Sequence, residues 1–308
     1  MNLESGDRTG KNQVEKPGGI DGWIDRAGWL DGLAEAVQGA ILAFFKALGA
    51  PGQRLKDLLH GTTPLGHPLH PALTDVPLGA FTVMVVADLA GLFTAAVPPV
   101  VGKLSLAIGI IGMAAAALAG YTDYTGTFGK ERRYATTHGL VMTAGLVAMI
   151  VSLVMRQEHL AGPAIAISSL TFLVILFGAF LGGHLSFGFG TMVNRNAFSE
   201  GVTEWTAVGS RDHFPDGKAV RVQAGDMPVL VVRHGNKFSA ISAVCSHAGG
   251  PLDEGELDAD IVTCPWHGSR FCIGDGKVKA GPATFDQPAF LVREAGGRIE
   301  VKLPASLH

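Results

Sequence analysis

Four apolar stretches in the middle of the chain constrain the fold more than any other feature of the sequence. Each is about 20 residues long with few charged side chains, which suits a helix that crosses a lipid bilayer once. They are separated by turn-like segments: Pro98-Pro99, the polar run GTFGKERRY and the run RQEHLAG. The four predicted spans are residues 76–97, 100–120, 136–155 and 163–183.

The alternative is a soluble protein with four buried helices. Helices buried in a soluble protein usually keep one polar face, and these stretches mostly have none. Small residues, such as the alanines at positions 114–117, suit close packing of helices in lipid. We therefore predict a transmembrane four-helix bundle within residues 58–196, after an amino-terminal tail of residues 1–57.

Basic residues in short loops predict the orientation of the bundle, because such loops tend to stay in the cytoplasm. With four spans, both termini and everything after the fourth span are then cytoplasmic, in the inner membrane of a bacterium. The first residues show no apolar core behind a basic start, so no secretory signal is predicted. The basic residues between spans two and three and ahead of span one are Lys130, Arg132, Arg133, Lys46, Arg54 and Lys56.

An amphipathic helix is predicted over residues 27–48, ahead of the first span. Apolar residues recur there at three- and four-residue spacing and form one helix face. The helix either lies in the membrane interface or packs on the carboxyl-terminal domain or on a partner subunit. The face consists of Trp29, Leu30, Leu33, Val37, Ile41, Phe44, Phe45 and Leu48.

The last third of the chain has a different pattern. Short β-branched runs broken by glycine, such as PVLVV and RIEVK, predict the strands of a small β domain within residues 197–308. Two loops of this domain carry the motifs CSHAGGPL and CPWHGSRF. Each motif pairs a cysteine with a histidine: Cys245 with His247, and Cys264 with His267.

These four side chains are predicted metal ligands. Two thiolates on one iron and two imidazoles on the other make the ligand set of a Rieske [2Fe-2S] cluster. The same set can make a Cys₂His₂ zinc site. The flanking residues favour the cluster, because Gly249, Pro265 and Gly268 form loops instead of the helix on which a zinc finger carries its histidines.

With these motifs, residues 203–303 resemble the Rieske domain family, most closely its ferredoxin branch. The resemblance implies an antiparallel β sandwich with the ligand loops at one tip and the two histidines exposed for electron exit. It also implies that Pro282, in GPA, belongs to a loop covering the cluster, and that Ser269 donates a hydrogen bond to a cluster sulfide. The additional cysteines of cytochrome bc Rieske proteins, which pair as a disulfide, are absent here.

A comparatively low redox potential is predicted for the cluster. Phe271 stands where the resemblance implies a potential-raising tyrosine hydroxyl, so fewer donors stabilise the reduced state. We expect a potential in the lower half of the Rieske range of about −150 to +300 mV. Redox titration at neutral pH checks this, and a midpoint near the top of the range would contradict it.

Several ionisable residues are predicted to meet at one cytoplasmic end of the bundle, because consecutive spans alternate in direction. Such groups at membrane depth are rare and mark a functional candidate. They could hold haem b, with His138 and His184 as axial ligands, another metal ion or a quinone headgroup. The alternative is that they only cap helices. The remaining members of the group are His67, His70 and Asp123.

The segment LLHGTTPLGHPLHPALTDVPLGAF resembles a bacterial membrane domain of unknown function, and the resemblance extends over about residues 55–195. It implies an architecture and no activity. Deeper in the first span, Asp88 needs a partner or a proton. Both proton movement and a bond to a neighbouring helix hydroxyl are open roles for it.

Together these patterns predict an α + β multidomain protein: a four-helix transmembrane bundle followed by a small all-β Rieske domain. We expect a membrane-anchored carrier of single electrons between a cytoplasmic donor and a membrane or protein acceptor, with no catalytic residue of its own. The alternatives are a haem- or quinone-linked oxidoreductase and a redox sensor. A ring oxygenase is excluded because only 41 residues follow His267, and a net charge of −3 argues against a nucleic-acid partner.

Overall fold

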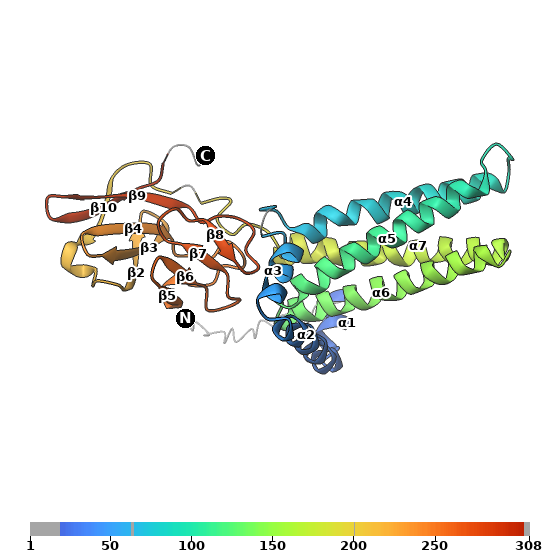
Figure 1. The fold of residues 1–308 in the computed structure, drawn as a ribbon, viewed down its shortest axis with the longest axis horizontal. Coiled ribbons are helices and arrows are strands. Elements are labelled where there is room, and N and C mark those ends of the chain that lie inside the picture. Colours follow the sequence, from blue (N-terminus) through green and yellow to red (C-terminus); the bar gives the residue numbers. More distant parts are fainter. Residues whose placement is uncertain (1–18, 63–64, 200, 305–308) are drawn as a thin grey trace, which may run out of the picture.

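The computed structural model describes residues 19–62, 65–199 and 201–304. Helices form the first part of the chain and strands the last part, and the two parts lie end to end along the long axis of the molecule (Figure 1). The segment for which no secretory signal is predicted lies mostly outside the described residues.

Four helices of the described chain are long and apolar enough to cross a membrane. This confirms the predicted bundle, but the first span lies further toward the amino terminus than expected. Pro68 precedes its first turn and Pro71 lies within that turn, where a missing N–H costs no helical hydrogen bond. The helices are α4 (Leu69–Gly91), α5 (Pro99–Tyr124), α6 (Gly129–Gln157) and α7 (Ala161–His184), and α7 continues into a π-helical turn, Leu185–Phe189.

The bundle packs around an apolar core and presents large apolar side chains on its outside. A Cβ atom on Gly109 would lie 2.3 Å from the ring of Phe81, so only glycine lets α4 and α5 approach this closely. Val86, Ile111 and Leu170 are mostly exposed on the outside of the bundle, as suits a lipid-facing surface. The buried core consists of Phe81, Met84, Leu106, Met113, Met149 and Ile175.

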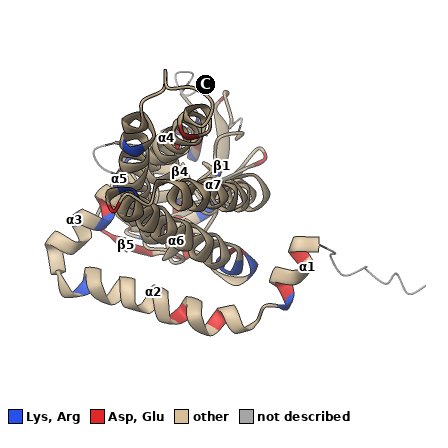
Figure 2. Cartoon of the chain, turned by 90° about the vertical axis from the view of Figure 1, so that its right-hand side faces the viewer, with Lys and Arg blue, Asp and Glu red and all other residues tan. Residues whose placement is uncertain are grey.

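Three shorter helices form a belt around one end of the bundle, and α2 runs across the direction of the spans (Figure 2). The predicted single apolar face of α2 is divided in the structure. Leu30 and Phe45 are buried, whereas Trp29 and Phe44 are 66% and 56% exposed. One side of α2 therefore packs on α5 and α6, instead of on the carboxyl-terminal domain as the sequence suggested. The other side offers aromatic side chains to the surroundings. The belt helices are α1 (Gly19–Arg26), α2 (Trp29–Ala47) and α3 (Gly49–His60).

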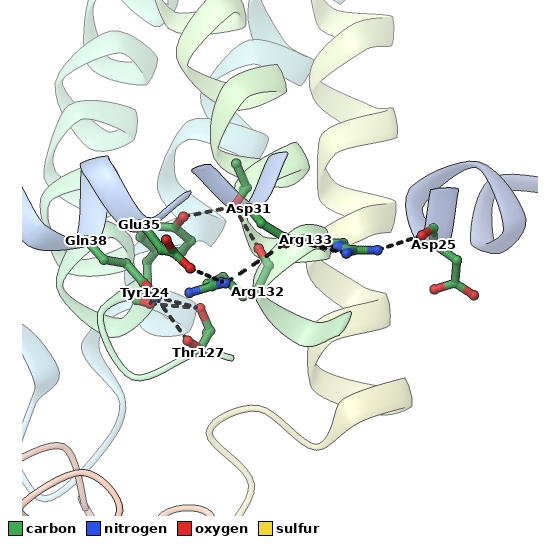
Figure 3. A network of polar contacts seen from close by, with 9 residues as sticks. Asp25, Asp31, Glu35, Gln38, Tyr124, Thr127, Arg132 and Arg133 are labelled. Atoms are coloured by element: carbon green, nitrogen blue, oxygen red, sulfur yellow. Dashed lines mark hydrogen bonds and ion pairs between the residues drawn. The ribbon is translucent and has the colours of Figure 1, made fainter. Parts of the chain in front are cut away.

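Ion pairs and hydrogen bonds fasten the belt to the end of α5, the α5–α6 loop and the first turns of α6 (Figure 3). The Arg133 guanidinium donates to both carboxylate oxygens of Asp31, over 2.9 and 2.6 Å. The Gln38 amide donates to the carbonyl oxygens of Tyr124 and Thr127, over 2.8 and 3.0 Å. The basic residues between spans two and three that were used to predict the orientation, including Arg132 and Arg133, lie in the first turns of α6. The belt thus holds the start of this helix and the loop before it in place.

Asp88 forms a buried ion pair with Arg156 of α6, near the end of the bundle away from the belt. The Arg156 guanidinium donates to both carboxylate oxygens, and one of these bonds measures 2.9 Å. Arg156 also donates to the Ser168 hydroxyl over 3.0 Å. Asp88 therefore has the partner that its depth requires.

The carboxyl-terminal part is a sandwich of two antiparallel sheets, as predicted. The larger has the order β1-β10-β9-β4-β3-β2, and the smaller has the order β5-β6-β7-β8. Leu230 and Ile241 of the larger sheet pack against Val262 and Phe271 of the smaller one. The strands are β1 (Thr206–Ser210), β2 (Ala219–Ala224), β3 (Met227–His234), β4 (Lys237–Ser242), β5 (Glu256–Asp258), β6 (Ile261–Thr263), β7 (Arg270–Cys272), β8 (Val278–Ala280), β9 (Ala289–Ala295) and β10 (Arg298–Lys302).

Candidate metal centre

The two motif loops have the same backbone geometry. Cys245 donates its N–H to the Gly250 carbonyl over 2.9 Å, and its own carbonyl accepts the N–H of Gly249 over 2.9 Å. Cys264 repeats this pattern with Ser269 and Gly268, over 2.8 and 3.0 Å. Gly249 and Gly268 have φ angles of +82° and +73°, a conformation that favours glycine. Two equivalent turns thus present one cysteine and one histidine each.

The four side chains converge at the tip of the sandwich. Cys245 and Cys264 are buried, and their sulfur atoms share a hydrogen bond. The rings of His247 and His267 are 5.0 Å apart between centroids, and each Nδ1 is buried without a hydrogen-bond partner. Buried nitrogens without partners are costly unless they bind a ligand. This donor set fits a metal cluster.

The protonation equilibria also suit metal binding. The pKa of Cys264 falls to about 6, first because of its hydrogen bond with Cys245 and then because the backbone N–H groups of Trp266 and His267 donate to its sulfur. The same cysteine pairing, followed by burial, raises the pKa of Cys245. Burial, followed by the nearby His267, His60 and Arg195, lowers the pKa of His247 to about 3. One thiolate and a neutral imidazole, the metal-binding forms, are therefore available at neutral pH.

Comparison with known proteins identifies the kind of domain to which these loops belong. Residues 204–291 match the family described as Rieske [2Fe-2S] domain. The sequence is 37% identical over 98 residues to the ferredoxin component of biphenyl 2,3-dioxygenase from Rhodococcus jostii (strain RHA1), a match spanning 32% of this chain and 92% of that protein. The chain belongs to the Rieske family. Such a domain implies a [2Fe-2S] cluster.

Further comparisons extend to both parts of the chain. Residues 66–195 match a predicted membrane protein family, DUF2231. The Rieske domain is 35% identical over 97 residues to the cytochrome b6-f complex iron-sulfur subunit of Chlorobaculum tepidum, covering 32% of this chain and 52% of that one. Among solved structures, the ferredoxin of carbazole 1,9a-dioxygenase from Nocardioides aromaticivorans IC177 is 31% identical, with a TM-score of 0.32, covering 33% of this chain and all of that one.

The local backbone favours a two-iron cluster over a zinc finger. His247 and His267 both lie in turns, whereas a zinc finger carries its histidines on a helix. Two loops that each present one thiolate and one imidazole match the ligand set of a Rieske cluster. All three cysteines of the chain are free, so the disulfide of the cytochrome bc type is absent.

The residues expected around the cluster lie close to the ligand loops. Ser269 is fully buried, and its hydroxyl oxygen accepts the Ala283 N–H over 3.1 Å. Its own O–H is thus free to donate elsewhere. Pro282 is buried in the loop that follows β8, next to Ala283, and lines a small pocket together with His247. Phe271 is fully buried in the apolar core beneath the loops.

The histidine edge of the Rieske domain is turned toward the membrane bundle. Phe128, in the α5–α6 loop, stacks on His267 at 5.8 Å between ring centroids. A Cβ atom on Gly126 would lie 3.5 Å from His247 and 3.8 Å from His267. The resemblance implies exposed histidines, but here both are half-buried at the junction of the two domains.

Two hydrogen bonds join the loop that contains Gly281 and Pro282 to the helical part of the protein. These two bonds are called the latch below. The N–H of Gly281 donates to the Asp57 carboxylate of α3 over 3.0 Å. The Thr62 hydroxyl donates to the Gly281 carbonyl over 2.6 Å. Gly281 has φ +89°, and a Cβ atom there would lie 2.7 Å from the Gly268 carbonyl. Only glycine therefore allows this loop to approach the second ligand loop so closely.

A buried pair of polar residues lies beneath the junction. His60, at the end of α3, approaches a carboxylate oxygen of Asp123 with its Nδ1 at 2.7 Å. The other carboxylate oxygen and His60 Nε2 are buried without partners. Asp123 also lines a cavity of about 320 Å³ that His247 borders from the Rieske domain. The pair thus lies next to the candidate cluster.

The structure brings together only some of the predicted membrane-domain residues. The rings of His70 and His138 are 6.2 Å apart between centroids. His184 instead stacks on Tyr134 at 4.7 Å. His67 is exposed at the surface. The facing imidazoles are therefore His70 and His138, instead of the predicted pair of His138 and His184.

Sequence reasoning missed three residues of this junction: His60, Asp57 and Phe128. His60 lies within the segment LLHGTTPLGHPLHP, ahead of the predicted site residues His67 and His70. Its position next to a motif rich in histidine was the available signal. The other two residues carry no such signal, because their contacts depend on how the Rieske domain docks.

Proposed function

We propose that this chain is a membrane-anchored electron-transfer protein. Cys245, His247, Cys264 and His267 hold the cluster, which passes single electrons between a cytoplasmic redox protein and an acceptor at the membrane. The bundle anchors the chain in the inner membrane of a bacterium, with the Rieske domain and both termini in the cytoplasm. The relatives named above belong to a dioxygenase system and to a cytochrome complex, which supports a partner protein for this chain.

The contact between the histidine edge and the bundle is the observation that carries this proposal. His267 stacks on Phe128, and both ligand histidines adjoin Gly126. Because the edge with His247 and His267 faces the bundle, the cluster can exchange electrons with the membrane domain or with a redox group bound to it. Small hydrophilic reagents in solution reach this edge poorly. The linker supports this fixed docking, because Arg195 donates its N–H to the Ser246 carbonyl of a ligand loop over 3.0 Å.

Loosening the latch is expected to expose the cluster. The double substitution Asp57→Ala and Thr62→Ala removes both hydrogen bonds to Gly281. We expect ferricyanide, a hydrophilic oxidant, to oxidise the reduced cluster faster in this variant than in the wild-type protein. Stopped-flow absorbance on the full chain in lipid nanodiscs measures both rates.

The matched control is Asp253→Ala, which removes an exposed ion pair with Arg221 inside the Rieske domain. It should leave the oxidation rate unchanged. An unaltered EPR signal in each variant confirms that the cluster domain is folded. Equal rates in the wild-type protein and the latch variant would contradict an inward-facing cluster.

A haem-linked oxidoreductase is the second candidate function, and the facing pair of His70 and His138 favours it. The Nδ1 atoms of these rings lie 2.8 Å from the carbonyl oxygens of Ala116 and Gly178. With Nδ1 bonded to a carbonyl, Nε2 is left to bind a metal. Metal–imidazole bonds of about 2 Å place two axial rings roughly 6 Å apart between centroids, close to the separation in this structure.

A pyridine haemochrome assay on the purified full chain tests the haem site. We expect one haem b per chain, lost in His70→Ala and in His138→Ala. His184→Ala is the matched control and should retain the haem, because His184 stacks on Tyr134 instead. A protein with a full cluster and no haem would eliminate this second function and leave the first intact.

A further inference from the structure

The cavity at the domain junction has the composition of a binding site. It is formed by the α5–α6 loop, the segment after the π-helical turn of α7 and the first ligand loop of the Rieske domain. Its volume of about 320 Å³ is within the range of small-molecule sites. Phe128, Phe189 and Met192 supply apolar walls, and Asp123 and His247 supply polar groups.

The strongest polar feature of the cavity is the Asp123 carboxylate. One of its oxygens is fixed by His60 at 2.7 Å, and the other is buried without a partner. A buried acceptor of this kind needs a hydrogen-bond donor. A ligand hydroxyl supplies one, and an anionic ligand would be repelled.

The charges around the cavity favour a neutral ligand. Lys130 is paired with Asp25 at 3.1 Å, outside the cavity. Thr191 donates its hydroxyl to the Glu131 carboxylate over 2.5 Å, and Arg195 donates to the Phe189 carbonyl over 2.9 Å. The ionic groups of the lining are thus engaged with neighbouring protein groups.

The position of the cavity fits a lipid-soluble ligand. It lies at the end of the bundle next to the belt helices, where a bilayer meets water. Phe187, on the π-helical turn that leads into the cavity wall, is 94% exposed, and Phe198 of the linker is 93% exposed. Exposed aromatic side chains at this level are typical of a membrane interface.

From these observations we propose that the cavity binds the headgroup of a quinol, the reduced form of a quinone acceptor: a flat, neutral aromatic ring with a hydroxyl that donates to Asp123. The inference rests on the proposed function and names the class of its membrane partner. The ring lies between the apolar walls, next to His247. Bound there, it is adjacent to the cluster, and its isoprenoid or alkyl tail extends toward the lipid.

The test uses the full chain with its cluster in lipid nanodiscs, and the reduced protein is titrated with a short-chain ubiquinol. Binding of the matching ubiquinone, which would oxidise a reduced cluster, is measured on the oxidised protein by isothermal titration calorimetry. We expect a saturable change in the EPR line shape of the reduced cluster, since the ligand lies beside His247. A hydrocarbon with the same tail and an unsubstituted ring is the control for simple partitioning into lipid. It should cause no saturable change.

Two variants sharpen the test. A Gly126→Leu side chain projects into the cavity from a position whose Cβ makes only ordinary contact with His247, and it should abolish the change. The matched control is Gly79→Leu, where a side chain meets open space on α4. In Asp123→Asn, either an amide N–H or an uncharged amide oxygen takes the place of the unpartnered carboxylate oxygen. The quinol hydroxyl then loses its charged acceptor, so the affinity ratio of quinol to quinone should fall about tenfold or more.

Three outcomes would overturn the inference: no saturable change, a change that the hydrocarbon reproduces, or binding that survives Gly126→Leu. None of these affects the latch experiment, which tests the proposed function separately. Conversely, quinol binding combined with equal oxidation rates in the latch experiment would retain the binding site and reject the inward-facing cluster.

Discussion

Replacing His247 by alanine is expected to abolish the Rieske EPR signal of the reduced protein. His247 supplies one of the two imidazoles proposed for the second iron, and its buried Nδ1 has no other partner. Loss of one of four protein ligands leaves an iron with a single imidazole, so the cluster assembles poorly or becomes a different species. EPR spectroscopy, together with analysis of iron and acid-labile sulfide, measures the outcome.

The matched control is His213→Ala, because His213 is exposed and lies in the short helix after β1, outside the two ligand loops. Its signal and iron content should equal those of the wild-type protein. A Rieske signal retained in His247→Ala would contradict the ligand assignment. Loss of the signal in the control as well would point to general instability of the domain.

Breaking the ion pair between Asp88 and Arg156 is expected to destabilise the bundle strongly. The two side chains are only 4% and 7% exposed, so removing either partner leaves a buried charge without its counter-ion. Such a loss costs about 3–5 kcal/mol of unfolding free energy. We expect this range for both Asp88→Asn and Arg156→Gln, measured by denaturant unfolding in detergent micelles.

The double substitution Asp88→Leu with Arg156→Met separates the ion pair from simple packing. With both charges removed, no unpaired group remains, and stability should equal or exceed that of the wild-type protein. The control is Lys103→Gln, an exposed charge near the same end of the bundle. Single variants as stable as the wild-type protein would show that the pair contributes nothing.

Much of the architecture followed from local patterns. The length and apolarity of four stretches determine four helices, since each can bury its backbone polar groups in lipid only as a helix. Short alternating or β-branched runs predict the strands of the β domain, and the resemblance to the Rieske family implied that they form a sandwich. The ligand loops could also be predicted from the sequence, because glycines follow the ligands, and Gly249 and Gly268 take the positive φ that each turn needs. The ends of the helices were predicted less accurately: the first span begins at Leu69, seven residues before its predicted start.

The junction depended on the tertiary structure. His60 meets Asp123 across 63 residues of sequence, and Gly281 meets Asp57 across 224. No spacing rule links such positions, because the rotation of each helix and the docking of a separate domain decide which side chains face one another. The same holds for Asp88, whose partner Arg156 was predicted to lie in a loop.

The sequence by itself therefore determined the elements and the cluster motif, since both depend on short-range periodicity and on loop-forming glycines. Only the tertiary structure decided what the cluster faces. It turned the edge with His247 and His267 inward onto Phe128 and Gly126, and it paired His138 with His70 instead of His184. The physical reason is that packing, which buries apolar surface between distant segments, selects one relative arrangement from the many that the same elements allow.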